Sequence, residues 1–146
     1  PCYNMFNRKP ETGVFPVLEK LGKGAVSYSS LAQGMLTNKY LHGIPADSRA
    51  QKATIPFLHP GVVKQTLTTI AALNDLAAAR GQSLAQMAVA WNLRQPALAS
   101  VLIGAGRPAQ VIDNVQALAN LDFTSTELAQ IDAILAAQPK IDWQAQ

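Results

Sequence analysis

The apolar residues of this chain recur at two spacings, one typical of helices and one of buried strands. Residues 13–21 carry apolar side chains at helical spacing, and this pattern stops at Gly22. Residues 25–29 and 98–103 are short runs that favour β structure. Together with residues 1–4, which resemble the end of another strand, they predict about three strands.

Two helices joined by a tight turn are expected in the middle of the chain. In residues 62–80 the apolar positions mark one helix face, and Gly81 supplies the C-terminal stop. Ser83 and Gln86 have the spacing of a capping box, in which two residues satisfy each other's free backbone N–H groups. They predict the start of a second helix, which ends before Pro96.

Two further helices are predicted in the last third of the chain. Pro108 suits the first position of a helix that runs to about Leu118, because a proline lacks only an N–H that has no helical partner there. Thr124 and Glu127 form another capping box, and Pro139 ends the last helix. The order of the elements is an α/β pattern with parallel strands.

The chain has the size of one domain, and residues 1–146 are expected to form a single one. It has 146 residues, of which 49% are hydrophobic and 14% are charged, so it can bury a core. Three strands cannot close a (β/α)8 barrel, which takes eight strands and about 250 residues. Residues 30–60, punctuated by glycine and proline, predict a long loop of the kind that is usually functional or disordered.

Composition favours a soluble, cytoplasmic protein without a membrane segment. No apolar run reaches the length of about 18 residues that a membrane span needs, and no secretory signal opens the chain. The single cysteine, Cys2, cannot form a disulfide within the chain, which fits a reducing compartment. The two histidines and one cysteine lack the spacing of a metal site, so no metal is expected.

The charge pattern favours a small anionic ligand over nucleic acid. The net charge is +3, but the positive residues are scattered rather than gathered in a basic stripe with interleaved aromatic residues. We therefore expect no nucleic-acid partner.

Two segments have the composition of a phosphate site. Residues 104–109 follow a predicted strand, open a helix and match the pattern G-x-G-x-x-G/A, so backbone N–H groups at the helix start would stabilise a phosphate. A plain glycine turn fits as well, because Asp122 leads into a capped helix instead of ending a second strand. Residues 27–40 offer hydroxyls, backbone amides near Gly34 and, with Arg49 further on, positive charge, although a solvated loop is equally compatible.

Both segments resemble signatures of the aldo-keto reductases. Residues 27–40 resemble the S-P-L-A-x-G-x-L-T-x-K-Y signature after the seventh strand of that family, and residues 100–106 resemble S-V-L-I-G-A-S at the eighth. The resemblance extends to Tyr3-Asn4, to the loop 43–49 and to residues 110–115. The nearest branch contains the bacterial glyceraldehyde-3-phosphate reductases and the potassium-channel β-subunits.

The resemblance implies the C-terminal half of a (β/α)8 TIM barrel, whose partner would be the missing N-terminal half or a second copy. It also implies NADP(H), with Tyr28 stacked on the nicotinamide. The pyrophosphate would be lined by Ser29, Leu31, Ala32 and Gly34, with Lys39 and Arg49 over it and over the 2′-phosphate. The adenosine end would be held by Gly104, Gly106, Arg107, Gln110, Asp113 and Asn114.

Three residues depart from the family pattern. Ser30 replaces a proline, Gly106 replaces a serine that donates a hydrogen bond, and Asp113 is one methylene shorter than the usual glutamate. Each departure weakens the implied site, since one lost hydrogen bond costs about 0.5 to 1.5 kcal/mol.

The implied function is an NADP(H)-dependent reductase of small aldehydes or ketones whose catalytic residues lie outside this chain. The family's tyrosine, lysine, aspartate and histidine belong to the first half of its barrel, and positioned general acids typically contribute 10²- to 10⁴-fold to such reactions. His42 and His59 are expected at the surface or in packing. The alternative is a non-catalytic NADP(H)-binding or regulatory half-barrel.

Overall fold

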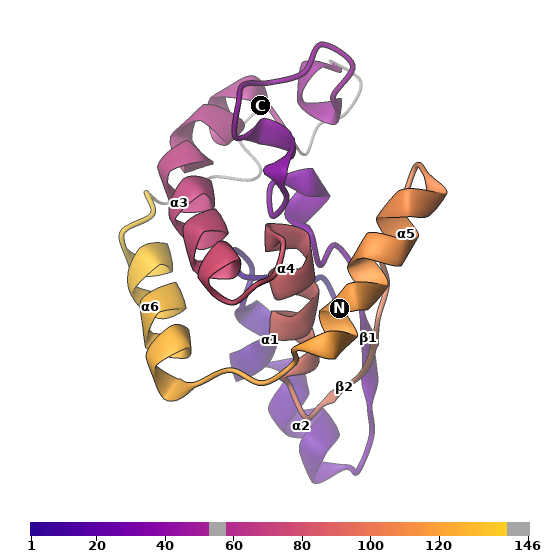
Figure 1. Ribbon diagram of the computed structural model, residues 1–146. Helices are drawn as coiled ribbons and strands as arrows, with labels where there is room; N and C mark the ends of the chain where they lie inside the picture. The colour runs from indigo at the N-terminus through magenta and orange to yellow at the C-terminus, as the bar shows by residue number, and fades with distance from the viewer. Residues whose placement is uncertain (53–57, 140–146) are drawn as a thin grey trace.

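The computed structural model describes residues 1–52 and 58–139 and contains a small parallel sheet covered by helices (Figure 1). Trp143, which the sequence predicts to be a packing residue of the tail, lies outside the described residues. The elements in chain order are α1 (Lys9–Thr12), α2 (Val14–Lys20), β1 (Ala25–Ser27), η1 (Ala32–Gly34), η2 (Asn38–Tyr40), η3 (Arg49–Gln51), α3 (Pro60–Ala79), α4 (Leu84–Leu93), β2 (Leu98–Val101), α5 (Pro108–Val115), η4 (Gln116–Ala119) and α6 (Ser125–Ala136).

The two strands are parallel, as the alternation of elements predicts. Ala25 pairs with Leu98 and Ser27 with Val101, with one irregularity in the register between them. The strand expected at residues 1–4 is reduced in the structure to a single parallel bridge between Cys2 and Tyr28. The described part of the chain is therefore an α/β piece with a two-stranded sheet.

The strand predicted over residues 25–29 is shorter in the structure, and the cause is local. Ser29 has a φ of 58°, a left-handed conformation that no extended strand contains. The strand therefore ends at Ser27, and the chain turns sharply into the loop that follows. The helix predicted over residues 13–21 is present as α2, and Gly13 separates it from the short α1, which the sequence pattern did not predict.

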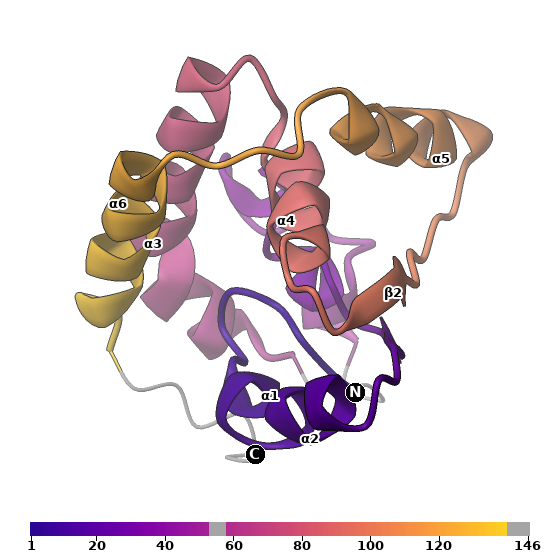
Figure 2. The ribbon, with the colours of Figure 1, turned by 90° about the horizontal axis from the view of Figure 1, so that it is seen from below.

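Helix α4 is the centre of the packing. It contacts α3 on one side, β2 on another and α5 on a third, and α6 packs against α3 (Figures 1 and 2). The ring of Trp91 on α4 is fully buried and stacks on Tyr3 at a centroid distance of 5.1 Å, and Tyr3 meets Phe15 edge-on at 4.9 Å. The segment before α1 is thus joined to the core by aromatic packing.

Several large apolar side chains stay exposed on β1, after both strands, on α5 and on η4. Leu102 is 59% exposed and Ile112 is 65% exposed, and Val26, Tyr28, Val111, Val115 and Leu118 are also exposed. Within the described residues, no helix is long and apolar enough to cross a membrane.

Candidate functional site

The carboxyl ends of β1 and β2 bring the two motif segments together. Because the strands are parallel, the residues after Ser27 and after Val101 leave the sheet at the same edge. The N–H of Leu102 donates to the carbonyl of Ser27 at 2.8 Å, and the Ser30 hydroxyl donates to the carbonyl of Leu102 at 3.3 Å. Ligands of parallel α/β sheets bind at this edge, so the fold places both segments where a site is expected.

Ser30 has a structural function that explains its difference from the family's proline. Its side chain is buried, at 2% exposure, and its hydroxyl joins the loop after β1 to the loop after β2. A proline at this position has no hydroxyl and cannot make this link. The departure from the signature therefore adds a hydrogen bond between the two halves of the candidate site.

The loop after β1 has a run of left-handed residues. Ser29, Ala32 and Gln33 have φ values of 58°, 46° and 60°, and Gly34 has a φ of 94°. Short hydrogen bonds hold this shape, including Ala32 N–H to the Ser29 carbonyl and Gly34 N–H to the Leu31 carbonyl, both at 2.9 Å. Non-glycine residues adopt this conformation at a cost and mostly at functional sites or tight turns.

The residues predicted to face the cofactor in this loop differ in their exposure. The Tyr28 side chain is 52% exposed, whereas Leu31 is half-buried against the core and Ala32 is part of it. Ser29 and Gly34 are also half-buried. Because its side chain is buried, Ala32 can face a ligand only through its backbone groups, whereas the Tyr28 ring is accessible to a ligand.

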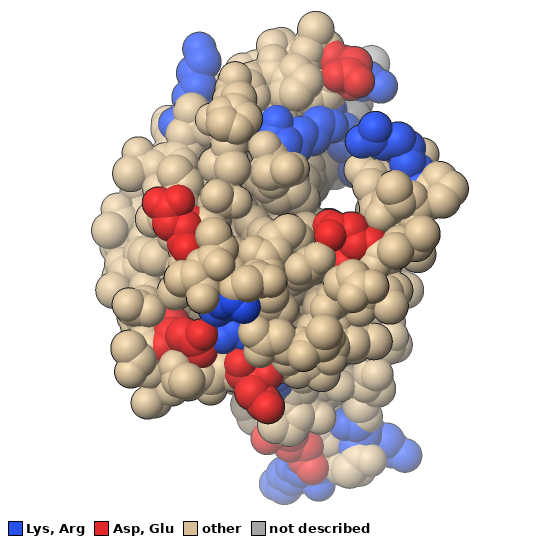
Figure 3. Space-filling model, in the orientation of Figure 1, with Lys and Arg blue, Asp and Glu red and all other residues tan. Residues whose placement is uncertain are grey.

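Lys39 and Arg49 lie on two short 3-10 helices and both have exposed side chains. Thr37 caps the first of these helices by accepting from the Lys39 N–H at 3.1 Å, and its own hydroxyl donates to the Gly34 carbonyl at 2.7 Å. Tyr40, which follows Lys39 in the sequence, is fully buried, and burial raises the pKa of its hydroxyl. Positive side chains gather where this loop faces the start of α5, beside an opening in the surface (Figure 3).

The turn after β2 leads into α5 as predicted, with Pro108 in its first turn. Gly104, Gly106 and Arg107 are exposed. The Gln110 side-chain oxygen accepts from the N–H groups of Gly106 at 2.8 Å and Arg107 at 3.2 Å. Two amides that a phosphate would use are therefore already satisfied by Gln110 in this structure. An open hollow beside this turn is lined by Ala105, Gly106, Arg107, Pro108, Val111 and Ile112.

Asp113 contacts the protein itself, and Asn114 is buried. Asp113 accepts from Gln86 Nε2 at 2.7 Å and from the Ser83 hydroxyl at 3.5 Å, so it binds the start of α4. Asn114 is only 5% exposed. The capping box at Ser83 and Gln86 was expected from the sequence, but its contact with Asp113 was not, because pairing across 27 residues leaves no local signal.

Sequence reasoning assigned no function to Asn4, although it is directly joined to the loop after β1. Its Nδ2 donates to the Ser29 carbonyl at 2.9 Å, and its Oδ1 accepts from the N–H groups of Phe6 at 2.9 Å and Asn7 at 3.0 Å. The resemblance of Tyr3-Asn4 to a family motif was the only signal for this residue.

The histidines and the cysteine lie apart from any metal-binding cluster in residues 1–52 and 58–139. There, no three histidine, cysteine or acidic side chains group closely enough to hold a metal ion. His42 is exposed and His59 is half-buried, and Cys2 is a half-buried free thiol. Trp91 is in the core, as predicted from the sequence.

Comparison with known proteins finds relatives along almost the whole chain. The chain is 44% identical over 149 residues to the L-glyceraldehyde 3-phosphate reductase of Escherichia coli K12, covering 99% of this chain and 43% of that protein. It is 37% identical over 144 residues to a probable voltage-gated potassium channel subunit beta of rice, Oryza sativa, covering 96% and 44%. The chain thus spans less than half the length of these curated relatives.

Solved structures also resemble this chain over most of its length. A glycerol dehydrogenase from Gluconobacter oxydans superimposes with a TM-score of 0.76 at 29% identity, over 97% of this chain and 43% of the other. A thermostable aldo-keto reductase, at 21% identity and a TM-score of 0.61, shares the fold over 91% of this chain and 38% of its own. Residues 1–136 match the family model described as the aldo/keto reductase family, and the chain therefore belongs to that family.

Proposed function

We propose that this chain supplies the NADP(H)-binding part of an oxidoreductase that reduces small aldehydes or ketones. The observation that carries the proposal is the edge where β1 and β2 end side by side, with the two family signatures joined by the Ser30 to Leu102 hydrogen bond. Neither segment alone distinguishes a phosphate site from an ordinary turn. Their meeting at the ligand-binding edge of a parallel sheet favours the site.

The residues at this edge fit a dinucleotide, although not all of them fit equally. Tyr28 offers an accessible ring at the nicotinamide end, and the exposed Lys39 and Arg49 offer charge for phosphates. When bound, the nicotinamide supplies the hydride of the reduction. The turn at Gly104, Gly106 and Arg107 is also accessible. The Gly106 and Arg107 amides can bind a phosphate only if Gln110 releases these N–H groups or shares them with the phosphate.

The substrate is proposed to be a small carbonyl compound, since two relatives are described as a glyceraldehyde 3-phosphate reductase and a glycerol dehydrogenase. Reduction of a carbonyl forms an alkoxide, which needs a positioned proton donor. We assign that donor to residues outside this chain. The function of Tyr28 and its neighbours is then to bind and orient the cofactor.

We further propose that residues 1–146 are one domain that forms the C-terminal half of a TIM barrel. The exposed apolar residues on β1 and α5, among them Val26 and Ile112, support this proposal because the other half of a barrel would cover both elements. A cytoplasmic location stays a prediction, for which the free Cys2 is the support.

The experiment is a pair of assays on the complete protein and on the 146-residue chain. We expect the complete protein to oxidise NADPH with glyceraldehyde 3-phosphate or methylglyoxal, and the chain alone to give no turnover above that of its Lys39→Ala, Arg49→Ala variant. Cofactor binding without carbonyl reduction by the complete protein would favour a regulatory NADP(H)-binding module. Turnover by the chain alone above that variant would show that its own residues supply the proton.

A further inference from the structure

Asn4 joins two segments of the chain through three hydrogen bonds of its side-chain amide. The side chain is 4% exposed. Its oxygen accepts from the Phe6 and Asn7 N–H groups, and its nitrogen donates to the Ser29 carbonyl at 2.9 Å. The orientation of the amide is unambiguous, because backbone N–H groups can only donate and a carbonyl can only accept.

The acceptor of the Asn4 bond is a residue with an unfavourable backbone conformation. Ser29 is left-handed, with a φ of 58°, and its carbonyl also accepts from the Ala32 N–H at 2.9 Å. A serine keeps such a conformation only where neighbouring groups hold it. The buried amide of Asn4 is one of the groups that hold it, and it comes from 25 positions earlier in the sequence.

The segment that contains Asn4 also fixes the neighbouring Tyr28. The Tyr28 N–H donates to the Pro1 carbonyl at 3.0 Å, and the Tyr3 N–H donates to the Tyr28 carbonyl at 3.2 Å. Because about half of the Tyr28 side chain is exposed, at 52%, the direction of its ring depends strongly on this backbone. The start of the chain therefore holds both residues that leave the end of β1.

We propose that Asn4 is a positioning residue for the nicotinamide end of the cofactor site, acting through Ser29 on the ring of Tyr28. The inference rests on the proposed function, since Tyr28 has a ligand only if the chain binds a dinucleotide. Asn4 touches no substrate or cofactor itself. Its loss therefore affects the nicotinamide end of a ligand and spares the adenosine end.

Asn4→Asp is the sharpest variant, because it keeps an oxygen that accepts from Phe6 and Asn7 and replaces the donor to Ser29 with an oxygen, while also adding a negative charge that the control must match. Asn7→Asp is the matched control. It removes an amide donor in the same turn, whose bond of 3.4 Å goes to the Cys2 carbonyl and not to Ser29. If Asn4→Asp does not fold, Asn4→Ser serves the same purpose, since its short hydroxyl can accept locally but cannot reach Ser29.

Two ligands separate positioning from general damage to the fold. In the complete protein, calorimetric titration with NADP⁺ should show about two- to tenfold weaker binding for Asn4→Asp, the range of one lost hydrogen bond. Adenosine 2′,5′-bisphosphate, which has no nicotinamide, should bind within about twofold of wild type. In a Tyr28→Ala background, Asn4→Asp should cause no further loss of NADP⁺ affinity, since the two residues act in series.

The outcomes that contradict the inference are distinct. Equal losses for both ligands, additive losses with Tyr28→Ala, or a loss as large in Asn7→Asp would mean that Asn4 only stabilises the fold. Unchanged NADP⁺ binding in Asn4→Asp would overturn the inference while leaving the proposed function intact. A wild-type protein that binds neither ligand would overturn the proposed function, and this inference with it.

Discussion

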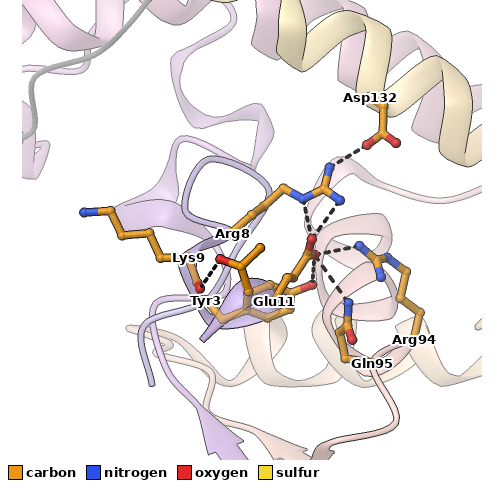
Figure 4. A network of polar contacts seen from close by, with 8 residues as sticks. Tyr3, Arg8, Lys9, Glu11, Arg94, Gln95 and Asp132 are labelled. Carbon is orange, nitrogen blue, oxygen red and sulfur yellow. Dashed lines mark hydrogen bonds and ion pairs between the residues drawn. The ribbon is translucent and has the colours of Figure 1, made fainter. Parts of the chain in front are cut away.

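The carboxylate of Glu11 forms a salt bridge of 3.0 Å with Arg94, although the two residues lie 83 positions apart. The same carboxylate accepts from the Tyr3 hydroxyl at 2.6 Å and from the Arg8 Nε at 3.0 Å (Figure 4). The guanidinium groups of Arg8 and Arg94 lie 5.5 and 4.1 Å from the centroid of the Trp91 ring. Glu11 thus joins α1 to the end of α4, around Trp91, the largest fully buried side chain among the described residues.

Glu11→Gln should therefore destabilise the protein by about 1.5 to 3 kcal/mol, the range for hydrogen bonds to a charged group. The substitution keeps the shape of the side chain but removes the charge that binds both arginines, while Arg94 stays only 20% exposed. Urea unfolding followed by circular dichroism measures the loss. Glu19→Gln, a change of the same type at an exposed position of α2, is the control, and an equal effect there would contradict this account.

The stability that Glu11 contributes should depend on pH. Burial raises the pKa of Glu11, but hydrogen bonds from Arg8 and Tyr3 and the charges of Arg8 and Arg94 lower it more, so its pKa lies below 4.5. A carboxyl whose pKa is lower in the folded state stabilises the fold above its unfolded pKa, and this contribution disappears as the pH falls through the folded pKa.

The difference in unfolding free energy between wild type and Glu11→Gln should therefore be constant above about pH 5 and shrink below it. Using the difference removes the contribution of other carboxyls, such as Glu127, whose pKa is also lowered. Unfolding curves from about pH 6 down to pH 3 measure it. A difference that grows on acidification would mean that the sign of the Glu11 shift is wrong.

Short-range signals in the sequence predicted the helix ends well. The capping boxes at Ser83–Gln86 and Thr124–Glu127 both form, and Gly81 has the left-handed φ of 69° expected of a helix stop. Pro108 begins α5. Each of these features depends on one residue or on two residues three positions apart, so a local pattern is enough to identify it.

Contacts between distant segments were not predictable in the same way. The Asp113 contact with Gln86, the Asn4 bond to Ser29 and the Glu11 network all depend on the fold that brings their residues together. The shared edge of the two motif segments was implied by the family resemblance, and the parallel register of β1 and β2 is consistent with it. Cofactor contacts of the individual residues stay predictions.

Gly106→Ser should strengthen NADP(H) binding by a few-fold, because it restores a hydroxyl that the family signature has at this position. The structure has room for it: a Cβ at Gly106 would lie 3.8 Å from the Gln110 side-chain oxygen, an ordinary contact, and the position is exposed. One added hydrogen bond of about 0.5 to 1.5 kcal/mol corresponds to roughly two- to tenfold. Fluorescence titration with NADPH measures the change, with Gly106→Ala as the control that adds the Cβ without the hydroxyl. Equal gains in both variants would mean that the gain comes from backbone stiffening.

Arg49→Ala should weaken NADP(H) binding in the complete protein by roughly tenfold or more and should affect NAD(H) far less. The Arg49 side chain is exposed at the start of η3, as Lys39 is on η2, so both are accessible to an anion. A charge-assisted hydrogen bond to phosphate contributes about 1.5 to 3 kcal/mol, and each 1.4 kcal/mol is a factor of ten in affinity. The 2′-phosphate is the group that distinguishes the two cofactors, so a loss confined to NADP(H) assigns Arg49 to it.

Lys20→Ala, which removes an exposed positive charge from α2 at the opposite end of the molecule (Figure 1), is the control for a general effect of charge. Equal losses for NADP(H) and NAD(H) would instead place Arg49 at the shared pyrophosphate, because both cofactors carry that group.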